Sequence, residues 1–155
     1  MHTELRSPAG EALTALVLEL FRVNNLILGW GDRLVAPLGL TSARWQVLGA
    51  VGTADRPQPV AWLARDLGAS RQNVQRIVND LAQAGLVEFA PNPHHKRAQL
   101  VVLTEAGAAA SAAALALYDP RSNVLAAGIA AEDLAAARRV LAVLRARLDA
   151  EGTQP

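Results

Sequence analysis

The stretch LARDLGASRQNVQRIVNDLAQAGLV, Leu63–Val87, predicts two short helices joined by a tight turn. Gly68 stands where a residue in the left-handed conformation commonly ends a helix, and Ser70 is a natural N-cap for the next one. The apolar residues of the second helix recur at i, i+3, i+4 and i+7 spacing: Val74, Ile77, Val78 and Leu81. Two helices joined by a short turn that contains glycine are typical of a helix-turn-helix.

The other side of the second helix carries amide and guanidinium groups. With the apolar side buried, the residues turned outward are Arg71, Gln72, Asn73, Gln75, Arg76 and Asn79. Asp80 and Gln83 lie towards the far end. An α-helix fits the major groove of B-DNA, where Arg reads guanine and Asn or Gln reads adenine through paired hydrogen bonds. A solvated surface helix would instead carry Glu–Lys pairs at i, i+4, and this helix has neither residue type, so the pattern favours DNA recognition.

The composition is that of one ordinary globular domain. The chain has 155 residues, of which 52% are hydrophobic and 19% are charged. The longest uncharged run, Ala106–Tyr118, is too short to span a bilayer, and no secretory signal is visible, so we expect a cytoplasmic protein. The absence of cysteine excludes disulfides, thiolate metal sites and cysteine redox switches.

The basic residues are concentrated around the quoted stretch. Between Arg56 and Arg97 there are six basic residues and three acidic ones, whereas the formal net charge of the whole chain is only +1. The rest of the chain is therefore net acidic. Such asymmetry is expected of an electrostatic footprint confined to one face.

The flanking sequence predicts further helices and a β-ribbon. Pro37 and Gly39 end a first helix, Thr41 or Ser42 caps a second, and Pro59 occupies the first position of a third. After Gly85 the period changes, and LVEFA and AQLVVL predict two strands separated by the turn PNPHHKR. The expected terminal helices are residues 9–35, a helix capped by Thr104 and interrupted at Asp119–Pro120, and residues 131–148. This order predicts a mainly α fold: a winged helix-turn-helix with a two-stranded β wing, framed by N- and C-terminal helices.

The turn of the ribbon is basic. Lys96 and Arg97 at its tip can reach phosphates or a narrow minor groove, where the negative potential attracts arginine. Two basic residues in a turn usually only face solvent. Their position directly after a recognition helix favours a contact with DNA.

The segments LTSARWQVLGAV, LARDLGASRQNVQRIVNDLAQAGLVE and KRAQLVVLTEAG, in this order and spacing, resemble the MarR family of winged-helix transcriptional regulators. The resemblance covers nearly the whole chain, and it implies that residues 1–155 form a single domain. It implies a DNA-binding part at residues 39–104 and a helical dimerisation part at residues 9–37 and 105–150. It further implies a cytoplasmic homodimer on a pseudo-palindromic operator, often a repressor that a small aromatic ligand releases from double-stranded DNA.

The resemblance also assigns DNA-binding positions. Those on the recognition helix are Ser70, Arg71, Gln72, Asn73, Gln75 and Arg76, and those on the wing are His95, Lys96 and Arg97. The family commonly has Asp two residues before the wing arginine, where it orients that arginine by a salt bridge, and this chain has His95. We hypothesise that protonation of His95 adds charge to the wing, so that DNA affinity rises as the pH falls towards 6.

The resemblance implies a ligand crevice, which regions containing Trp30, Arg44, Trp45 and Trp62 border in related proteins, and we expect the ligand pocket at Trp30, Arg44 and Trp45. Tryptophan beside a guanidinium can hold an aromatic acid by stacking and a charge-assisted hydrogen bond. Packing in the protein core is the other interpretation of each tryptophan. The proline at Asp119–Pro120 also departs from the family, which usually has an unbroken helix there.

Two other classes of function fit the sequence less well. An enzyme would need a nucleophile, a base and an orienting group, and the sequence offers no such constellation, no glycine-rich phosphate loop, and no cofactor motif. Adjacent histidines at His94–His95 are too few ligands for a metal, so no metal site is expected. A winged helix used only for protein–protein contacts remains the alternative, and it would more commonly show an apolar patch on the exposed helix face.

Overall fold

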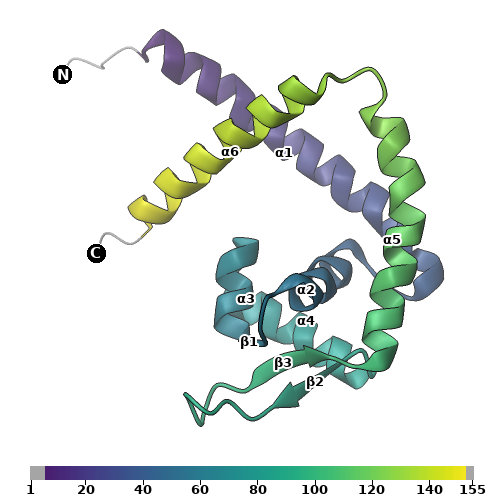
Figure 1. Cartoon of the computed structure of the whole chain (residues 1–155). Helices are drawn as coiled ribbons and strands as arrows, with labels where there is room; N and C mark the ends of the chain where they lie inside the picture. Colours follow the sequence, from purple (N-terminus) through teal and green to yellow (C-terminus); the bar gives the residue numbers. More distant parts are fainter. Residues whose placement is uncertain (1–5, 153–155) are drawn as a thin grey trace. The chain divides into compact units, whose positions relative to one another are not determined.

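The computed structural model describes residues 6–152. Helices dominate it, with one small sheet, and this confirms the predicted fold class (Figure 1). In chain order the elements are α1 (Pro8–Val35), a 3-10 turn η1 (Ala36–Leu38), α2 (Ser42–Thr53), β1 (Gln58–Pro59), α3 (Val60–Leu67), α4 (Arg71–Gln83), β2 (Val87–Ala90), β3 (Leu100–Leu103), α5 (Glu105–Ala126) and α6 (Ala131–Glu151). The chain forms two compact units, Met1–Tyr118 and Asp119–Pro155.

Helix α1 begins and ends at the residues that its local chemistry favours. The hydroxyl of Ser7 accepts a hydrogen bond from the Gly10 N–H at 3.1 Å, and Pro8 takes the first helical position, where a missing N–H costs nothing. The helix passes into η1 and stops at Gly39, whose φ is 69°. Among the described residues, Pro8–Leu38 is the one helical stretch long and apolar enough, by length and composition, to cross a membrane.

The helix-turn-helix forms as predicted. Gly68 adopts φ 63° after α3, a conformation that glycine reaches without steric cost, and Ser70 caps α4 through a 3.2 Å hydrogen bond from the Asn73 N–H. The buried side chains of α2, α3 and α4 meet in one core under the turn. Its members there are Val47, Leu48, Val60, Leu63, Ala64, Val74, Ile77, Val78 and Leu81.

The sheet has three strands, one more than the predicted two-stranded wing. In the order β1-β3-β2, both pairs are antiparallel, with Gln58 opposite Val101 and Phe89 also opposite Val101. Pro59 lies in β1 and caps α3, and the first helical residue is Val60, so the prediction that Pro59 opens the helix is wrong by one position. A proline is tolerated in β1 because this short strand lies at the edge of the sheet.

Helix α5 continues through the predicted interruption. It begins after Thr104, whose hydroxyl accepts from the Gly107 N–H at 3.0 Å, and it extends past Pro120 to Ala126. The proline removes one backbone donor. The alanine-rich sequence around it favours helix strongly, and the Ser122 hydroxyl donates to the Asp119 carbonyl at 2.9 Å. The prediction of a break at Asp119–Pro120 is therefore wrong.

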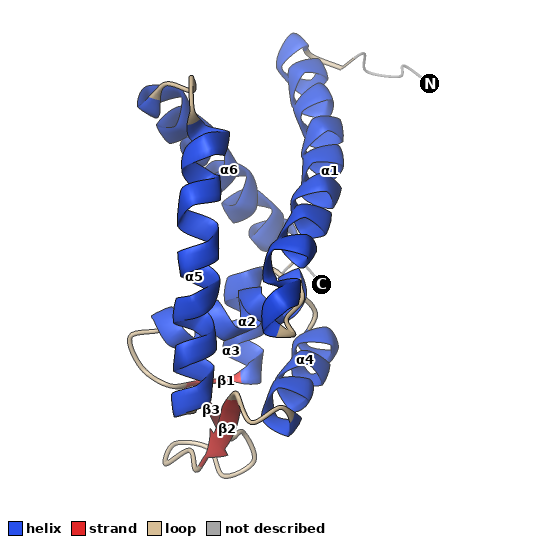
Figure 2. Ribbon diagram, turned by 90° about the vertical axis from the view of Figure 1, so that its right-hand side faces the viewer, coloured by secondary structure: helices blue, strands red, loops and turns tan. Residues whose placement is uncertain are grey.

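Figures 1 and 2 show how the first unit is arranged around α4. Helix α4, the predicted recognition helix, and the β2–β3 hairpin lie next to each other at one end of this unit. The second unit, taken by itself, consists of the end of α5 and α6, and none of its described residues is fully buried. The fold thus places the predicted reading helix and the predicted wing at one end of the first unit.

Candidate DNA-binding surface

The outward face of α4 is built by burial of the opposite face. Val74, Ile77, Val78 and Leu81 are buried in the core, which sets the rotation of the helix. Arg71, Gln72, Asn73, Arg76 and Asn79 are consequently exposed, and Gln75 is half-buried. The orientation predicted for these six side chains is the one observed.

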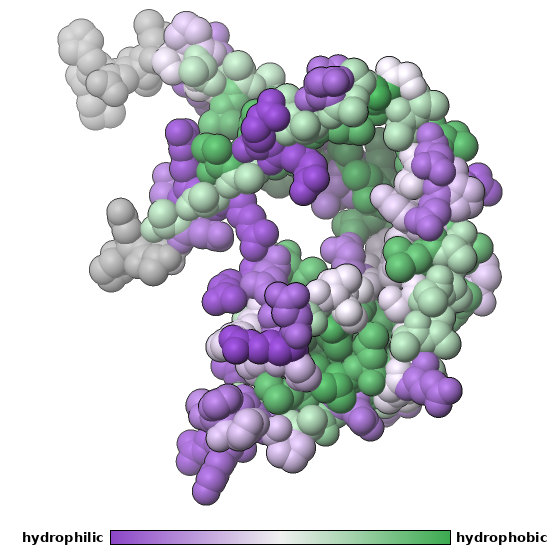
Figure 3. Space-filling view, viewed as in Figure 1, coloured by the Kyte–Doolittle hydropathy of each residue, from purple (hydrophilic) through white to green (hydrophobic). Residues whose placement is uncertain are grey.

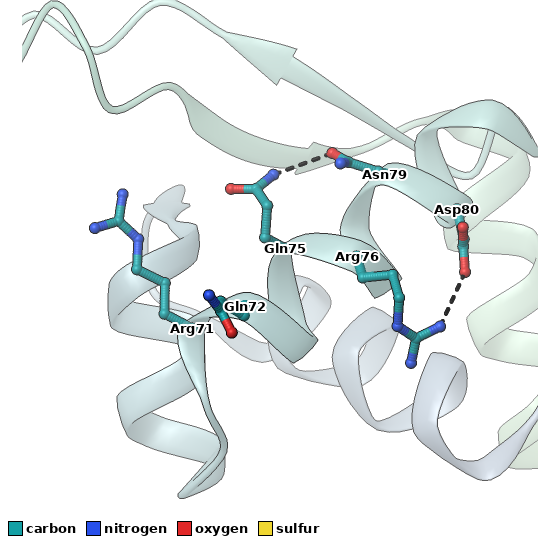
Figure 4. Close-up of a pocket in the computed structure, with 6 residues that line it drawn as sticks. All are labelled: Arg71, Gln72, Gln75, Arg76, Asn79 and Asp80. Carbon is teal, nitrogen blue, oxygen red and sulfur yellow. Dashed lines mark hydrogen bonds and ion pairs between the residues drawn. The ribbon is translucent and has the colours of Figure 1, made fainter.

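Six side chains of α4 line an open concavity on the surface (Figure 4). They are Arg71, Gln72, Gln75, Arg76, Asn79 and Asp80. No acidic residue lies in the first turn of the helix, so the partial positive charge of its N-terminus is reinforced by Arg71. Polar donors, a helix N-terminus without an acidic residue and solvent access are what a helix needs to bind an anionic backbone and read base edges.

The polar side chains of α4 differ in whether they already form hydrogen bonds with other side chains of the protein. Gln75 donates to the Asn79 side-chain oxygen at 3.0 Å, and Arg76 donates to the Asn73 side-chain oxygen at 3.0 Å. Within residues 6–152, the side chains of Arg71 and Gln72 make no hydrogen bond or ion pair. The start of the helix is therefore free to bind, and its second and third turns are partly ordered in advance.

Asp80 connects this face to α2, a contact that the sequence did not reveal. Its carboxylate accepts from the Arg44 guanidinium at 3.4 Å and lies 3.6 Å from a terminal nitrogen of Arg76. Arg44 precedes Asp80 by 36 residues, so helical periodicity gives no signal for the pair. Of the predicted ligand residues, Arg44 is thus engaged with the α4 surface.

The wing loop is closed by Asn92. Its side-chain NH₂ donates to the Ala98 carbonyl at 2.8 Å, and its side-chain oxygen accepts from the His94 N–H at 3.0 Å. A backbone hydrogen bond of 3.3 Å from the His95 N–H to the Asn92 carbonyl completes the turn. Asn92 was not among the residues predicted from the sequence, although Asn followed by Pro is a known turn signal.

The predicted wing residues are accessible. His95, Lys96 and Arg97 are all exposed in the β2–β3 loop. In Figure 3 the loop forms the hydrophilic projection at the lower left, the place that it occupies in Figure 1. Lys96 and Arg97 give this projection a positive character, because no acidic residue lies in the loop between β2 and β3.

Trp30 and Trp45 both contact the aromatic ring of Tyr118. Tyr118 contacts Trp30 edge-to-face at 5.9 Å between ring centroids, and it contacts Trp45 in the same manner at 5.5 Å. All three are half-buried. Tyr118 was not among the predicted site residues, because nothing in its alanine-rich surroundings indicates that α5 brings it to Trp30 in α1 and Trp45 in α2.

Trp62 lies in different surroundings. Its side chain is exposed on α3, and the guanidinium groups of Arg56 and Arg65 lie 5.4 and 5.8 Å from its ring centroid. Arg65 also contacts the Asp66 carboxylate at 3.2 Å. Trp62 therefore makes no part of the aromatic cluster of Trp30, Trp45 and Tyr118.

Comparisons with known proteins agree with this geometry. Residues 38–98 match a model of the MarR family. An uncharacterized protein of Mycobacterium tuberculosis is 42% identical over 97 residues, which are 63% of this chain and 66% of that protein, slightly under two thirds of its length. The multiple antibiotic resistance protein MarR of Escherichia coli is 36% identical over 100 residues, or 60% of this chain and 67% of MarR.

A solved structure extends the similarity to the fold. A mutant of E. coli MarR, crystallised in complex with operator DNA, is 27% identical to this chain and superposes with a TM-score of 0.68, over 83% of this chain and 94% of that one. The winged-helix architecture, the family match and the level of identity to MarR lead to one conclusion. The chain belongs to the MarR family, whose solved members among these relatives are transcriptional regulators.

Proposed function

We propose that this protein is a homodimeric regulator that binds double-stranded DNA sequence-specifically and represses transcription until a small ligand releases it. The observation that carries the proposal is the exposed row of amides and guanidiniums on α4, beside a basic wing. In helix-turn-helix proteins the N-terminal part of the second helix meets the base edges. Here that part contains Arg71 and Gln72, which have no partner among the described residues and so have donors to offer.

The chemistry of each side chain on this surface suggests which part of the DNA it contacts. Arg71 and Arg76 suit paired hydrogen bonds to guanine, and Gln72, Asn73 and Gln75 suit adenine. Ser70 already caps the helix, so its role is to hold the first turn against the phosphates. Lys96 and Arg97, with His95, contact the backbone or the minor groove through the wing.

Apolar side chains outside the core support dimerisation. In α1 the exposed fractions of Phe21, Leu26 and Ile27 are 65%, 72% and 56%, and in α6 those of Val143 and Leu148 are 51% and 58%. Large exposed apolar surfaces mark interaction sites in soluble proteins. A second copy of the chain is the occupant that a two-fold operator requires, since each copy offers one reading helix.

A lipid bilayer is the less suitable partner for α1. Within the helix, Glu19 and Arg22 form an ion pair of 3.3 Å with 61% and 74% of their side-chain surface exposed. Charged side chains at the centre of a membrane-spanning helix each cost about 2.5–3.5 kcal/mol on insertion scales. A protein interface accommodates such a pair at its rim without that penalty.

The effector site is proposed at Trp30, Arg44 and Trp45, around Tyr118. An aromatic acid would stack on the indoles and place its carboxylate against the guanidinium. Arg44 is already bound to Asp80, so the ligand carboxylate would compete with that side chain. In a Trp62→Phe variant, which removes the exposed indole from the signal, titration with salicylate should quench the remaining tryptophan fluorescence and release the operator. If millimolar salicylate produced neither quenching nor release, the proposed effector site would be refuted.

The test of the whole proposal is selection of DNA by the purified protein. Fragments retained from a random pool should share a two-fold motif whose half-site centres lie about one helical turn apart, roughly 10 base pairs. Retained fragments without a common motif would favour the alternative, a winged-helix module for protein–protein contacts. That alternative also predicts that substitutions at Arg71 and Arg76 leave DNA retention unchanged.

A further inference from the structure

Asp80 is the one acidic side chain on α4, and it faces the concavity formed by the reading residues (Figure 4). About one third of its side chain is exposed, and its carboxylate is shared by two guanidiniums, those of Arg44 from α2 and Arg76 from α4. An acid on a DNA-binding face repels phosphates. Its presence there needs an explanation that the binding of DNA alone does not provide.

The carboxylate restricts the orientation of Arg76. One terminal nitrogen of Arg76 lies 3.6 Å from Asp80, and the other donates to the Asn73 side chain at 3.0 Å. The Arg76 side chain is nevertheless 66% exposed, so it is held at its end while still open to a ligand. A long exposed side chain that is already oriented loses less conformational freedom on binding.

Arg44 balances the charge. With Arg44 and Arg76 both bound to it, the carboxylate leaves the three groups with one net positive charge, so the approach of DNA is not opposed. Partly exposed ion pairs of this kind add little to folding stability. Their more substantial effect is on geometry, because the planar guanidinium must take the orientation that its partners set.

We propose that Asp80 is a positioning residue that orients Arg76 towards one base pair of the operator and so raises the specificity of binding, with Arg44 as its counter-ion. This inference rests on the proposed function. Without Asp80, Arg76 is free to reach phosphates, which are the same in every sequence. Removal of the carboxylate therefore strengthens binding to unrelated DNA and weakens the preference for the operator.

The experiment measures Kd for the selected operator and for a scrambled duplex of equal length, with the full-length protein at fixed salt. The readout is the specificity ratio, which is the Kd for the scrambled duplex divided by the Kd for the operator. In Asp80→Asn this ratio should fall about tenfold, as expected when one oriented hydrogen-bonded pair with a base is removed. The salt dependence of binding to the scrambled duplex should steepen by about 0.9 for each new phosphate that the protein neutralises.

Matched variants separate orientation from charge and from folding. Glu88→Gln removes an exposed acid from β2, a strand of the wing, and should strengthen binding to both duplexes without changing the ratio of their Kd values. Asp80→Glu keeps the carboxylate and should restore part of the ratio. In an Arg76→Ala background, Asp80→Asn should leave the ratio unchanged, because its effect passes through Arg76.

The outcomes are distinct. If the wild-type ratio is high and Asp80→Asn preserves it, or if Glu88→Gln lowers it equally, Asp80 has no positioning role and the proposed function stands. If Asp80→Asn still lowers the ratio without Arg76, the residue acts through the α2–α4 packing, which also overturns the inference. A wild-type ratio of one would refute the proposed function and the inference together.

Discussion

The hydroxyl of Ser42 donates a hydrogen bond of 2.6 Å to the backbone carbonyl of Leu28 and so joins the start of α2 to α1. The Ser42 N–H donates in addition to the Asp32 carboxylate at 2.7 Å. Ser42 is a buried polar residue, 5% exposed, and these two bonds satisfy it. The contact fixes α1, the proposed dimerisation helix, to α2 in the proposed DNA-binding part of the chain.

Ser42→Ala should lower the free energy of unfolding by about 1 kcal/mol, because the Leu28 carbonyl is deprived of a buried partner. Urea denaturation at a fixed protein concentration measures the change. Thr53→Ala is the control: its hydroxyl bonds the Gly49 carbonyl within one exposed helical turn, so a smaller decrease is expected. Equal decreases in the two variants would show that the bond to the Leu28 carbonyl stabilises the protein no more than a hydrogen bond within an exposed helical turn.

Gly107→Ala should destabilise the protein by about 1–3 kcal/mol, since an added Cβ would collide with the backbone carbonyl of Leu86. Backbone cannot move aside as a flexible side chain can. Gly49→Ala, within helix α2 and with open space around its Cβ, should instead gain up to about 1 kcal/mol from helix propensity. Thermal unfolding of both variants decides the matter, and a tolerated Gly107→Ala would contradict the close approach.

Arg71→Ala should cost about 1–3 kcal/mol on the selected operator and relax the base preference at one position of each half-site. Arg97→Ala should weaken binding to all sequences more evenly and reduce the salt slope by about 0.9, the value for one phosphate that is no longer neutralised. Fluorescence anisotropy at several salt concentrations separates the two effects. Unchanged binding in both variants would remove α4 and the wing from the DNA interface.

Leu26→Asp should shift the protein from dimer towards monomer, since the side chain is 72% exposed in one copy and a charge at the centre of an apolar interface is unfavourable. Sedimentation equilibrium reports the change in mass. Ala61→Asp, an exposed substitution on α3, should leave the mass unaltered. A wild-type protein that is monomeric at micromolar concentration would rule out the proposed dimer.

Local patterns in the sequence determined much of the fold and of the proposed DNA-binding surface. Ser70, Gly68 and the spacing of Val74, Ile77 and Leu81 predicted the limits and rotation of α4, and the structure has them. Capping, left-handed glycine and helical periodicity act within a few residues, so the chain itself reveals them. The six outward side chains followed from the same periodicity.

Only the tertiary structure decided what those side chains contact. Asp80 meets Arg44 across 36 residues of sequence, and Tyr118 meets Trp30 and Trp45 from another helix. The short strand β1 exists because β3 lies beside it, and α5 passes through Pro120 because the helix on both sides outweighs one missing hydrogen bond. Such contacts depend on how the helices pack, which is a property of the whole core, and no pattern of neighbouring residues encodes it.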